Sequence, residues 1–233
     1  MLRIVRRRHR ALLVDRGDVV SSLPDRPGPT HDLFDVLAAA VAAFAPGPRL
    51  ALLGFAAGSV VAPLRALGWT APIEAVDRDP RGQEIFRRMA AGWAGVVHVC
   101  RADAYAWLAR RRARFDAVLD DLSMPGLEGQ VKPPISLDGL PDLIARRLSP
   151  RGVAVVNLLP VPGGSWREAI AAVAAPFPET IVVEGELWEN RVAIAGSALP
   201  PPRAAGRRLR RALAALGSRE AGRIRIRRHR AGR

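Results

Sequence analysis

The sequence predicts a doubly wound α/β fold: a Rossmann-like, mostly parallel sheet closed by an antiparallel C-terminal hairpin. Short apolar runs alternate with segments of helical spacing through the middle of the chain, which is typical of parallel strands joined by right-handed helical crossovers. The last two apolar runs, 180–186 and 190–197, are only a few residues apart. Because no crossover fits between them, these two strands must be antiparallel. The 233 residues, 49% of them hydrophobic, are enough for one such domain with a full core.

Individual elements follow from this alternation. The chain opens with two short strands, 2–6 and 11–15, and a loop rich in proline and glycine at 21–30. An amphipathic helix begins at Thr30 or His31 and ends before the "APGP" that starts at Ala45. Five further strands are predicted at 49–53, 72–77, 96–100, 115–120 and 152–158. Helices are predicted at 59–67, 80–91, 103–112, 137–148 and 165–175.

The pattern divides the chain into a remnant hairpin and loop (1–29), the α/β domain (30–199) and an arginine-rich tail (200–233) outside the sheet. The net charge of +14 is almost entirely arginine, since Lys132 is the only lysine, and the arginines are concentrated at the two chain ends. Such runs are more often solvated or disordered ends than functional segments, although they also suit nucleic acid or an anionic membrane surface. A nucleic-acid partner for the tail is therefore an alternative, and not the favoured one.

Composition excludes several classes of protein. Cys100 is the only cysteine, so neither an internal disulfide nor a thiolate metal cluster can form. The four histidines have no ligand spacing, and we expect no metal. No apolar run reaches about 18 residues, so no transmembrane segment is expected. No long apolar segment follows the basic N-terminus, and we expect a cytoplasmic protein without a secretory signal.

The stretch "LALLGFAAGSV" at 50–60 predicts a ligand-binding turn. An uncharged strand stops at Gly54, Ala56 follows, and Gly58 precedes the next helix. Glycines at these positions permit positive φ and a close approach of the backbone to a ligand. In an open α/β sheet, ligands bind beyond the carboxyl ends of the strands. A tight strand–helix turn without any ligand explains the glycines equally well when they are taken alone.

Acidic residues at three further strand ends favour the ligand site. Asp77 ends the second strand, about 20 residues after the glycine turn, where a carboxylate can accept hydrogen bonds from ribose hydroxyls. Asp103 with Ala104 follows the third strand, and Asp120 with Asp121 ends the fourth. Carboxyl ends of parallel strands meet at one edge of a sheet, so the acids are predicted to surround one cleft.

Five stretches carry a resemblance to a known family: "LALLGFAAGS", "EAVDRDP", "CRADAYAWL", "FDAVLDDLSMP" and "RRLSPRGVAVVNL". They resemble the spermidine synthase family, within the class I S-adenosylmethionine-dependent methyltransferase superfamily, over roughly residues 30–197. The resemblance implies that the turn at Gly54, Ala56 and Gly58 binds the donor and that Asp77 holds its ribose. It also implies that Asp103 and Ala104 flank the adenine, and that Asp121 is the catalytic aspartate that helps to deprotonate the attacking amine.

On the acceptor side the resemblance is incomplete. His31 and Asp32 fit the helix in which the family carries a Tyr-His-Glu segment, while Thr30 replaces the tyrosine. Met124 stands where the family has a second acid, which binds the cationic polyamine. The resemblance thus implies acceptor contacts at His31, Asp32 and Met124, and describes a spermidine synthase-like protein rather than a spermidine synthase.

We therefore expect a transferase that binds S-adenosylmethionine or its decarboxylated form and passes an aminopropyl or methyl group to a small-molecule nucleophile. Two alternatives are a catalytically inactive nucleotide-binding module and an RNA-directed methyltransferase that uses the basic termini. The sequence leaves open which donor and acceptor are used, and whether the chain forms a homodimer.

Overall fold

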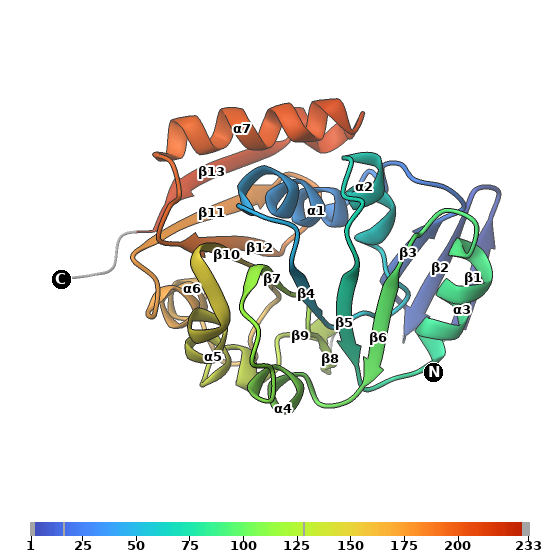
Figure 1. Cartoon of the computed structure of the whole chain (residues 1–233), viewed down its shortest axis with the longest axis horizontal. Helices are drawn as coiled ribbons and strands as arrows, with labels where there is room; N and C mark the ends of the chain where they lie inside the picture. Colours follow the sequence, from blue (N-terminus) through green and yellow to red (C-terminus); the bar gives the residue numbers. More distant parts are fainter. Residues whose placement is uncertain (1–2, 16, 128, 230–233) are drawn as a thin grey trace.

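The computed structural model describes residues 3–15, 17–127 and 129–229 and confirms the predicted fold class. Its centre is an eight-stranded sheet in the order β13-β11-β12-β10-β7-β4-β5-β6 (Figure 1). Five neighbouring strands are parallel: β6 (Val97–Arg101), β5 (Ile73–Asp77), β4 (Leu50–Leu53), β7 (Phe115–Asp120) and β10 (Leu148–Leu158). The predicted hairpin of β11 (Glu179–Gly185) and β12 (Arg191–Gly196) places β12 antiparallel to β10.

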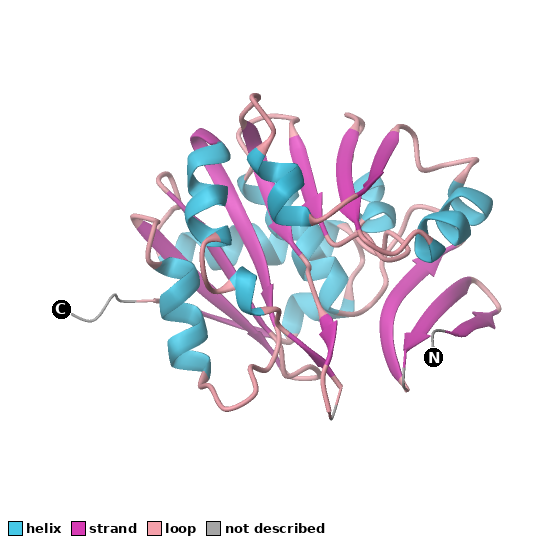
Figure 2. Cartoon of the chain, turned by 90° about the horizontal axis from the view of Figure 1, so that it is seen from below, coloured by secondary structure: helices cyan, strands magenta, loops and turns pink. Residues whose placement is uncertain are grey.

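Helices cover both faces of the sheet (Figure 2). They are α1 (Leu33–Phe44), α2 (Val61–Ala66), α3 (Arg81–Ala90), α4 (Ala104–Ala109), α5 (Leu140–Arg147), α6 (Trp166–Ala174) and α7 (Pro202–Ala215). Successive residues of a strand face opposite sides, so Leu50 and Leu52 pack under α1 and α2, whereas Ala51 and Leu53 pack under α4 and α5. Each strand and helix predicted between residues 30 and 197 is present, with ends that differ by a few residues.

Helix α1 is enclosed on almost all sides. Every residue of α1 except Ala42 is buried, because one side packs on the sheet and α7 covers the other. A helix that is apolar around its whole circumference requires such enclosure. Its N-terminus, from Asp32 to Phe34, reaches the candidate site described below.

The expectation that the tail at 200–233 lies outside the sheet was wrong. Helix α7 packs Leu209 and Leu213 against the core, a 3₁₀ turn η2 (Arg219–Gly222) follows, and β13 (Ile224–Arg228) pairs antiparallel with β11 at the sheet edge. The arginines obscured a strand pattern, since Ile224 and Ile226 alternate with arginine at the period of two that a half-buried strand shows. The arginine-rich end is part of the folded domain.

The N-terminal segment is larger than the predicted hairpin. Strands β1 (Arg3–Arg7), β2 (Arg10–Asp15) and β3 (Asp18–Pro24) form a three-stranded antiparallel sheet, so the predicted loop at 21–30 begins only after Pro24. Serines hold this sheet against the glycine turn. The Ser21 and Ser59 hydroxyls are 2.6 Å apart, and the Ser22 N–H donates to Ser59 Oγ at 2.8 Å. The segment thereby brings β3 to the edge of the candidate site.

A short excursion follows β7. Strands β8 (Met124–Pro125) and β9 (Gln130–Val131) form a two-stranded antiparallel ribbon, and a 3₁₀ turn η1 (Pro134–Ser136) leads into α5. The ribbon lies beyond the carboxyl end of β7, where Asp121 emerges from the sheet, and so it forms one rim of the candidate site.

Candidate functional site

A cleft of about 640 Å³ opens beyond the carboxyl ends of β4, β5, β6 and β7. Its walls come from the glycine turn, the acids that follow these strands, β3, the N-terminus of α1, the β8–β9 ribbon and the turn between β11 and β12. Gly54, Ala56, Asp77, Asp103, Ala104, Asp121, Asp32 and Met124 of the residues singled out from the sequence line it. Gly58 and His31 do not belong to its lining.

The turn after β4 is built from unusual backbone conformations. Gly54 has φ +84°, and a Cβ at this position would lie 2.7 Å from the backbone oxygen of Asp121. Gly58 has φ +74°, and its Cβ would lie 2.8 Å from the rings of Phe55 and Phe86. Only glycine relieves both constraints. Gly58 therefore shapes the turn from behind, whereas Gly54 brings the turn against the residue that follows β7.

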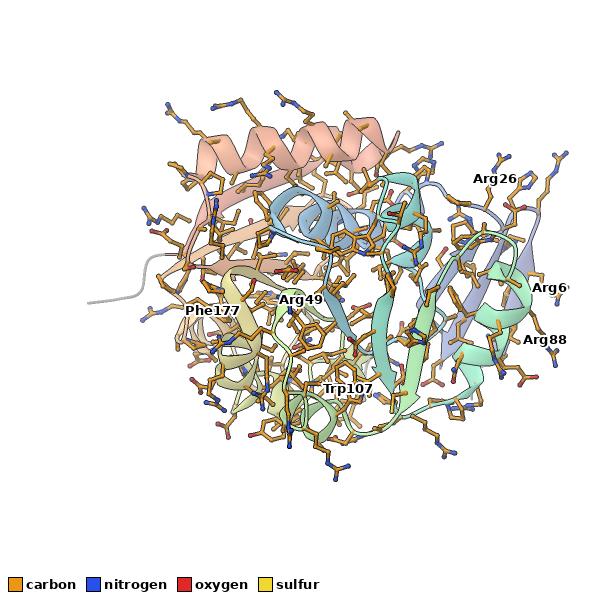
Figure 3. The ribbon with its side chains drawn as sticks, in the orientation of Figure 1. Arg6, Arg26, Arg49, Arg88, Trp107 and Phe177 are labelled. Atoms are coloured by element: carbon orange, nitrogen blue, oxygen red, sulfur yellow. The ribbon has the colours of Figure 1, made fainter. Side chains whose placement is uncertain are left out.

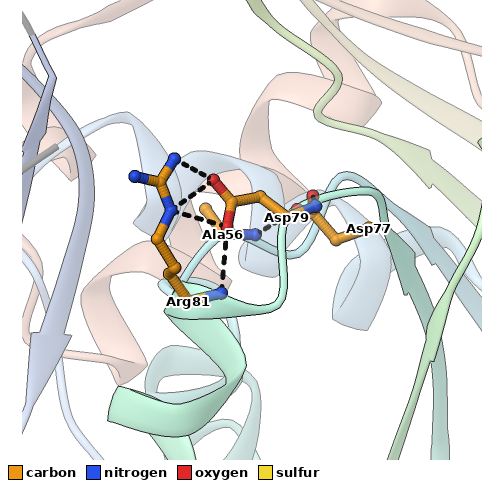
Figure 4. Close-up of polar contacts among 4 residues, drawn as sticks. All are labelled: Ala56, Asp77, Asp79 and Arg81. Atoms are coloured by element: carbon orange, nitrogen blue, oxygen red, sulfur yellow. Dashed lines mark hydrogen bonds and ion pairs between the residues drawn. The ribbon is translucent and has the colours of Figure 1, made fainter. Parts of the chain in front are cut away.

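Asp77 holds this turn in place. Its Oδ2 accepts the N–H groups of Phe55 and Ala56 at 2.8 and 2.7 Å, and its Oδ1 accepts the Asp79 N–H at 2.8 Å. Asp79 in turn accepts hydrogen bonds from Arg81, the first residue of α3 (Figure 4). A carboxylate has about four acceptor positions. The three N–H groups leave Asp77 one position for a ligand hydroxyl, and not the two that binding both ribose hydroxyls would use.

Asp103 caps the helix that follows β6. Its Oδ1 accepts the Ala106 N–H at 2.8 Å at the start of α4, which places Ala104 in the first turn of that helix. Asp103 also forms an ion pair with Arg78. The backbone hydrogen bond from Ala106 and the Arg78 guanidinium lower the pKa of the Asp103 carboxyl, which stays ionised at neutral pH.

Asp121 occupies a different environment from the other acids. Burial raises the pKa of its carboxyl to about 7, although the hydrogen bond from Asn157 acts in the opposite direction. Asn157 Nδ2 donates to Asp121 Oδ1 at 2.7 Å, and Asn190 Nδ2 donates to Asn157 Oδ1 at 2.8 Å. A carboxylate that titrates near neutrality and is held by a fixed donor is suited to accept a proton.

The preceding residue, Asp120, is buried in the interior. It is 1% exposed and forms a 2.9 Å ion pair with Lys132, which is 0% exposed. Lys132 Nζ also donates to the backbone oxygens of Asp120 and Leu122 at 3.4 and 3.2 Å. These bonds tie the chain beyond the β8–β9 ribbon to the end of β7. The only lysine of the sequence is therefore a buried partner of the strand end.

A buried carboxylate fixes the approach to α1. Asp35 Oδ1 accepts the Thr30 N–H and hydroxyl at 2.7 and 2.8 Å, and its Oδ2 accepts the His31 N–H at 2.9 Å. This holds His31 at φ +60°, away from the cleft lining, and presents Asp32 as the N-cap of α1 within it. Asp35 was not among the residues singled out from the sequence, because an acid in the first turn of a helix is ordinarily explained by its favourable interaction with the helix dipole.

Several other lining residues were also missed. They are Asp18 of β3, Asn157 of β10, and Trp188, Glu189 and Asn190 of the β11–β12 turn. Asn157 had a signal, since it is the one polar residue in the run "VAVVNLL". Only the folding of β3 and of the last hairpin brings Asp18 and Glu189 to the cleft, and no local pattern indicates that.

Acidic groups dominate the charge of the cleft. Its lining includes one arginine, Arg78, and six acidic side chains: Asp18, Asp32, Asp77, Asp103, Asp121 and Glu189. The chain as a whole carries +14. An acidic concave surface on a basic protein attracts cationic ligands and repels polyanions.

Among the described residues, no group of three or more His, Cys, Asp or Glu side chains is arranged to hold a metal ion. No helix within the described part of the chain is long and apolar enough to cross a membrane.

Comparisons with known proteins show the fold. Neither a scan against protein-family models nor a search of curated proteins finds a match. Human methyltransferase-like protein 13, solved in complex with SAH, is 21% identical, with a TM-score of 0.62 over 83% of this chain and 93% of that one. Spermidine synthase from Thermotoga maritima is 11% identical, with a TM-score of 0.61 over 85% of this chain and 73% of that one.

A SAM-dependent methyltransferase from Agrobacterium tumefaciens is 16% identical, with a TM-score of 0.59 over 84% of this chain and 70% of that one. All three identities are too low to carry an activity from one protein to another. The chain has the Rossmann-like fold of the class I methyltransferases, which spermidine synthase shares.

Proposed function

We propose that the protein is a group transferase that binds S-adenosylmethionine or its decarboxylated form and transfers a methyl or aminopropyl group to a small amine. One observation supports this most directly: an acidic cleft at the carboxyl ends of the strands contains an aspartate whose pKa is about 7. A sulfonium donor and an ammonium acceptor are both cations, and an acidic cleft attracts both.

The residues present fit such a donor. Gly54 allows the turn to lie directly against the backbone of Asp121, and Asp77 retains one acceptor position for a ribose hydroxyl. Asp103 and Ala104, at the start of α4, form the neighbouring wall where the family resemblance expects the adenine. When bound, the donor supplies an electrophilic carbon attached to a positively charged sulfur. The acids of the cleft compensate that charge.

Asp121 is proposed to take the proton of the acceptor. An alkylammonium ion has no free lone pair, so it must lose a proton before its nitrogen can attack. A carboxylate with a pKa of about 7 is half ionised at neutral pH and can accept that proton. Asn157 fixes the orientation of Asp121, and Asn190 fixes that of Asn157.

The acceptor side has anions in spite of Met124. Met124 is 42% exposed and contributes no charge at the position where the family resemblance expects an acid. Asp18, Asp32 and Glu189 also line the cleft. Asp32 matches the family resemblance, whereas Asp18 precedes the part of the chain that the resemblance covers and Glu189 lies outside its five matching stretches. We therefore propose a cationic amine as the acceptor class, held by these three carboxylates.

The same charges disfavour one alternative. An RNA-directed methyltransferase would have to place a polyphosphate chain at the cleft, whose carboxylates would repel it. The exposed arginines Arg203, Arg207 and Arg211 belong to α7, which lies at the opposite end of Figure 1 from the arrowheads of β5 and β6. The inactive-module alternative leaves the Asp121–Asn157–Asn190 series without a role.

Calorimetry with S-adenosylmethionine and with decarboxylated S-adenosylmethionine, side by side, tests the proposal. We expect one of the two to bind, and incubation of that donor with putrescine or spermidine to yield an alkylated amine detectable by mass spectrometry. Asp79→Ala is a matched control, since Asp79 lies two residues after Asp77, between β5 and α3, but outside the cleft lining. The proposal fails if the folded protein binds neither donor.

A further inference from the structure

The segment that connects α7 to β13 contacts the candidate site from behind. Ser218 is buried, and its hydroxyl donates to Asp35 Oδ2 at 2.6 Å. Together with the bonds from Thr30 and His31, this contact fills all four acceptor positions of the Asp35 carboxylate. Ser218 therefore completes the group of bonds that fixes the start of α1, where Asp32, Leu33 and Phe34 line the cleft.

Two residues later, Glu220 contacts a second wall of the cleft. Glu220 is 0% exposed, and its Oε2 accepts the indole N–H of Trp188 at 3.0 Å. The indole lies against Gly185, where a Cβ would come within 2.0 Å of Trp188 Cε2. Trp188 is thus held by a hydrogen bond at one edge and by a glycine on one face. Both contacts select a single orientation for the side chain that lines the cleft.

Trp188 belongs to the same turn as the residue that supports Asp121. Asn190, two residues further on, donates to Asn157, and Asn157 donates to Asp121. A second bond ties this turn to the C-terminal segment, since the Glu186 N–H donates to the Arg223 backbone oxygen at 3.1 Å. The C-terminal segment is therefore linked to the Asp121 carboxylate indirectly, through the β11–β12 turn and then through Asn190 and Asn157.

We propose that Ser218–Glu220, which we call the brace, positions the two acceptor-side walls of the cleft, with Ser218 and Glu220 as positioning residues. The proposal rests on the proposed function for the identity of the acceptor side. Among the described residues, the donor side at Gly54, Asp77 and Asp103 forms its hydrogen bonds with other partners and none with the brace. Loss of the brace should therefore affect the acceptor and the proton-accepting group, and leave the donor site largely intact.

The chemistry of Glu220 supports a positioning role over simple core filling. A carboxylate at 0% exposure is costly to bury, and an apolar side chain of similar size would stabilise the fold at least as well. Its Oε1 has no hydrogen-bond partner among the described residues, and the nearest cation, the Arg223 guanidinium, is 3.9 Å away. The one side-chain hydrogen bond of Glu220 among the described residues is thus the one it accepts from the Trp188 indole in the wall of the cleft.

The first test needs no ligand. The indole N–H signals of the five tryptophans are recorded by NMR, and Trp188→Phe identifies the signal of Trp188. We expect the indole proton of Trp188 to exchange with solvent roughly tenfold faster in Glu220→Ala than in the wild type, because one buried hydrogen bond is lost. Glu220→Gln retains an acceptor oxygen and should keep the wild-type exchange. Arg219→Ala, an exposed neighbour within the brace, is the matched control.

The second test uses spermidine as the amine probe on the full chain, together with whichever donor binds in the calorimetry above, S-adenosylmethionine or decarboxylated S-adenosylmethionine. In Glu220→Ala and Ser218→Ala we expect the KM for the amine to rise roughly tenfold, or its Kd where turnover is slow, while the Kd of the donor stays within about twofold. In Glu220→Gln the KM or Kd for the amine should stay at its wild-type value, and Arg219→Ala should not change it. A general loss of structure would weaken both constants together.

The two proposals fail in different ways. Absence of donor binding in the wild type contradicts the proposed function, and the indole exchange still reports on the brace. The brace is overturned if Glu220→Ala leaves the Trp188 indole signal and the amine constant unchanged. It is also overturned if donor and amine constants deteriorate to the same extent in Glu220→Ala and Ser218→Ala.

Discussion

Asp120 and Asp121 are adjacent, yet the end of β7 assigns them opposite environments. Asp120 is the last residue of the strand and is neutralised in the interior by Lys132. Asp121 is the first residue beyond the strand, lines the cleft and receives its hydrogen bond from the neutral Asn157. Two carboxyls with different environments can serve different roles, and here one is structural while the other can exchange a proton with a ligand.

The pKa of Asp121 predicts the pH dependence of turnover. Only the ionised carboxylate can accept a proton, so kcat should rise with pH up to about 7 and level off above it. Asp121→Asn removes the proton acceptor and should lower kcat roughly 10²–10⁴-fold while the Kd of the donor stays nearly constant. A pH-rate profile of each variant checks both points. Unchanged kcat in a folded Asp121→Asn protein would show that Asp121 only contributes to binding.

Substitution of Asn157 should shift the pKa of Asp121 without removing its carboxylate. Its hydrogen bond lowers the pKa of Asp121 against the effect of burial. In Asn157→Ala the carboxylate loses that donor, so the midpoint of the pH-rate profile should move above 7. The shift should vanish in Asn157→Ala combined with Asp121→Asn. A midpoint that stays in place in the single variant would mean that another group controls the profile.

Asp77 combines a structural and a binding role, and its substitution should show both. Asp77→Ala removes three hydrogen bonds from the glycine turn as well as the free acceptor position. We expect the donor Kd to increase about ten- to a hundredfold, equivalent to roughly 1.5–3 kcal/mol, together with a lower Tm. Asp79→Ala alters a neighbouring acid of the same network and should leave the Kd unchanged. Equal Kd values for the two variants would refute the ribose assignment.

At the scale of elements, helix α3 packs so tightly against the glycine turn that Gly82 has no room for a side chain. A Cβ at Gly82, the second residue of α3, would lie 1.9 Å from the Ala56 backbone oxygen. The turn therefore has helix α3 on one side and Asp121, across from Gly54, on the other. The position of Ala56 in the cleft depends on both neighbours.

Gly82→Ala should displace the turn. The added methyl group cannot be accommodated without moving backbone, so we expect a cost of about 1–3 kcal/mol in the free energy of unfolding and weaker donor binding. Gly92→Ala is the control, since its Cβ would meet no atom within 4 Å. Denaturant titrations and donor calorimetry measure the two effects. A Gly82→Ala protein with wild-type stability and affinity would show that α3 does not position the turn.

Sequence patterns predicted the elements that can be recognised from the order of apolar and polar residues within the element itself. The alternation of strands and helices located the parallel sheet. Asp77, Asp103 and Asp121, at the ends of β5, β6 and β7, line the cleft because carboxyl ends of parallel strands share one edge, whereas Asp120 faces the interior. Strand β3 was missed since its Ser21 and Ser22 resemble loop residues. Their partner is Ser59 of a distant turn.

The contributions of Trp188 and Asn190 could not be predicted for a similar reason. They lie in a hairpin turn without a motif, and their partners Glu220 and Asn157 come from other parts of the chain. A carboxylate or an amide whose partner is distant in sequence looks like an ordinary surface residue until the fold is known.

Over the whole molecule, negative charge is concentrated in the cleft and positive charge on the outer surface. Carboxylates line the cleft, whereas arginines such as Arg6, Arg26 and Arg88 point away from the body of the molecule (Figure 3). The arginines of the C-terminal segment belong to this outer layer, while the aliphatic residues between them are in the core. Charge and packing in this segment can therefore be separated by experiment.

Deleting residues 200–233 should unfold much of the protein. The deletion removes Leu209, Leu213 and Ile224 from the core, each worth about 1.5–3 kcal/mol of burial, and it exposes the outer side of α1. It also leaves β11 as an unpaired edge strand and removes the Ser218 contact with Asp35. Because these losses are comparable to the 5–15 kcal/mol stability of a typical domain, we expect the 1–199 chain to aggregate and to lose a cooperative thermal transition.

Replacing only the charge should have the opposite outcome. Arg203, Arg207 and Arg211 are exposed on α7, and their side chains form no hydrogen bond or ion pair with the described residues. The triple variant Arg203→Gln, Arg207→Gln, Arg211→Gln retains the helix and its buried leucines, so its Tm should stay within a few degrees of the wild type, as exposed substitutions usually do. Scanning calorimetry of both proteins makes the comparison. If the 1–199 chain instead stays monomeric with a wild-type Tm, the C-terminal segment is a dispensable addition to the sheet. If the triple variant unfolds with it, the arginine charge itself stabilises the fold.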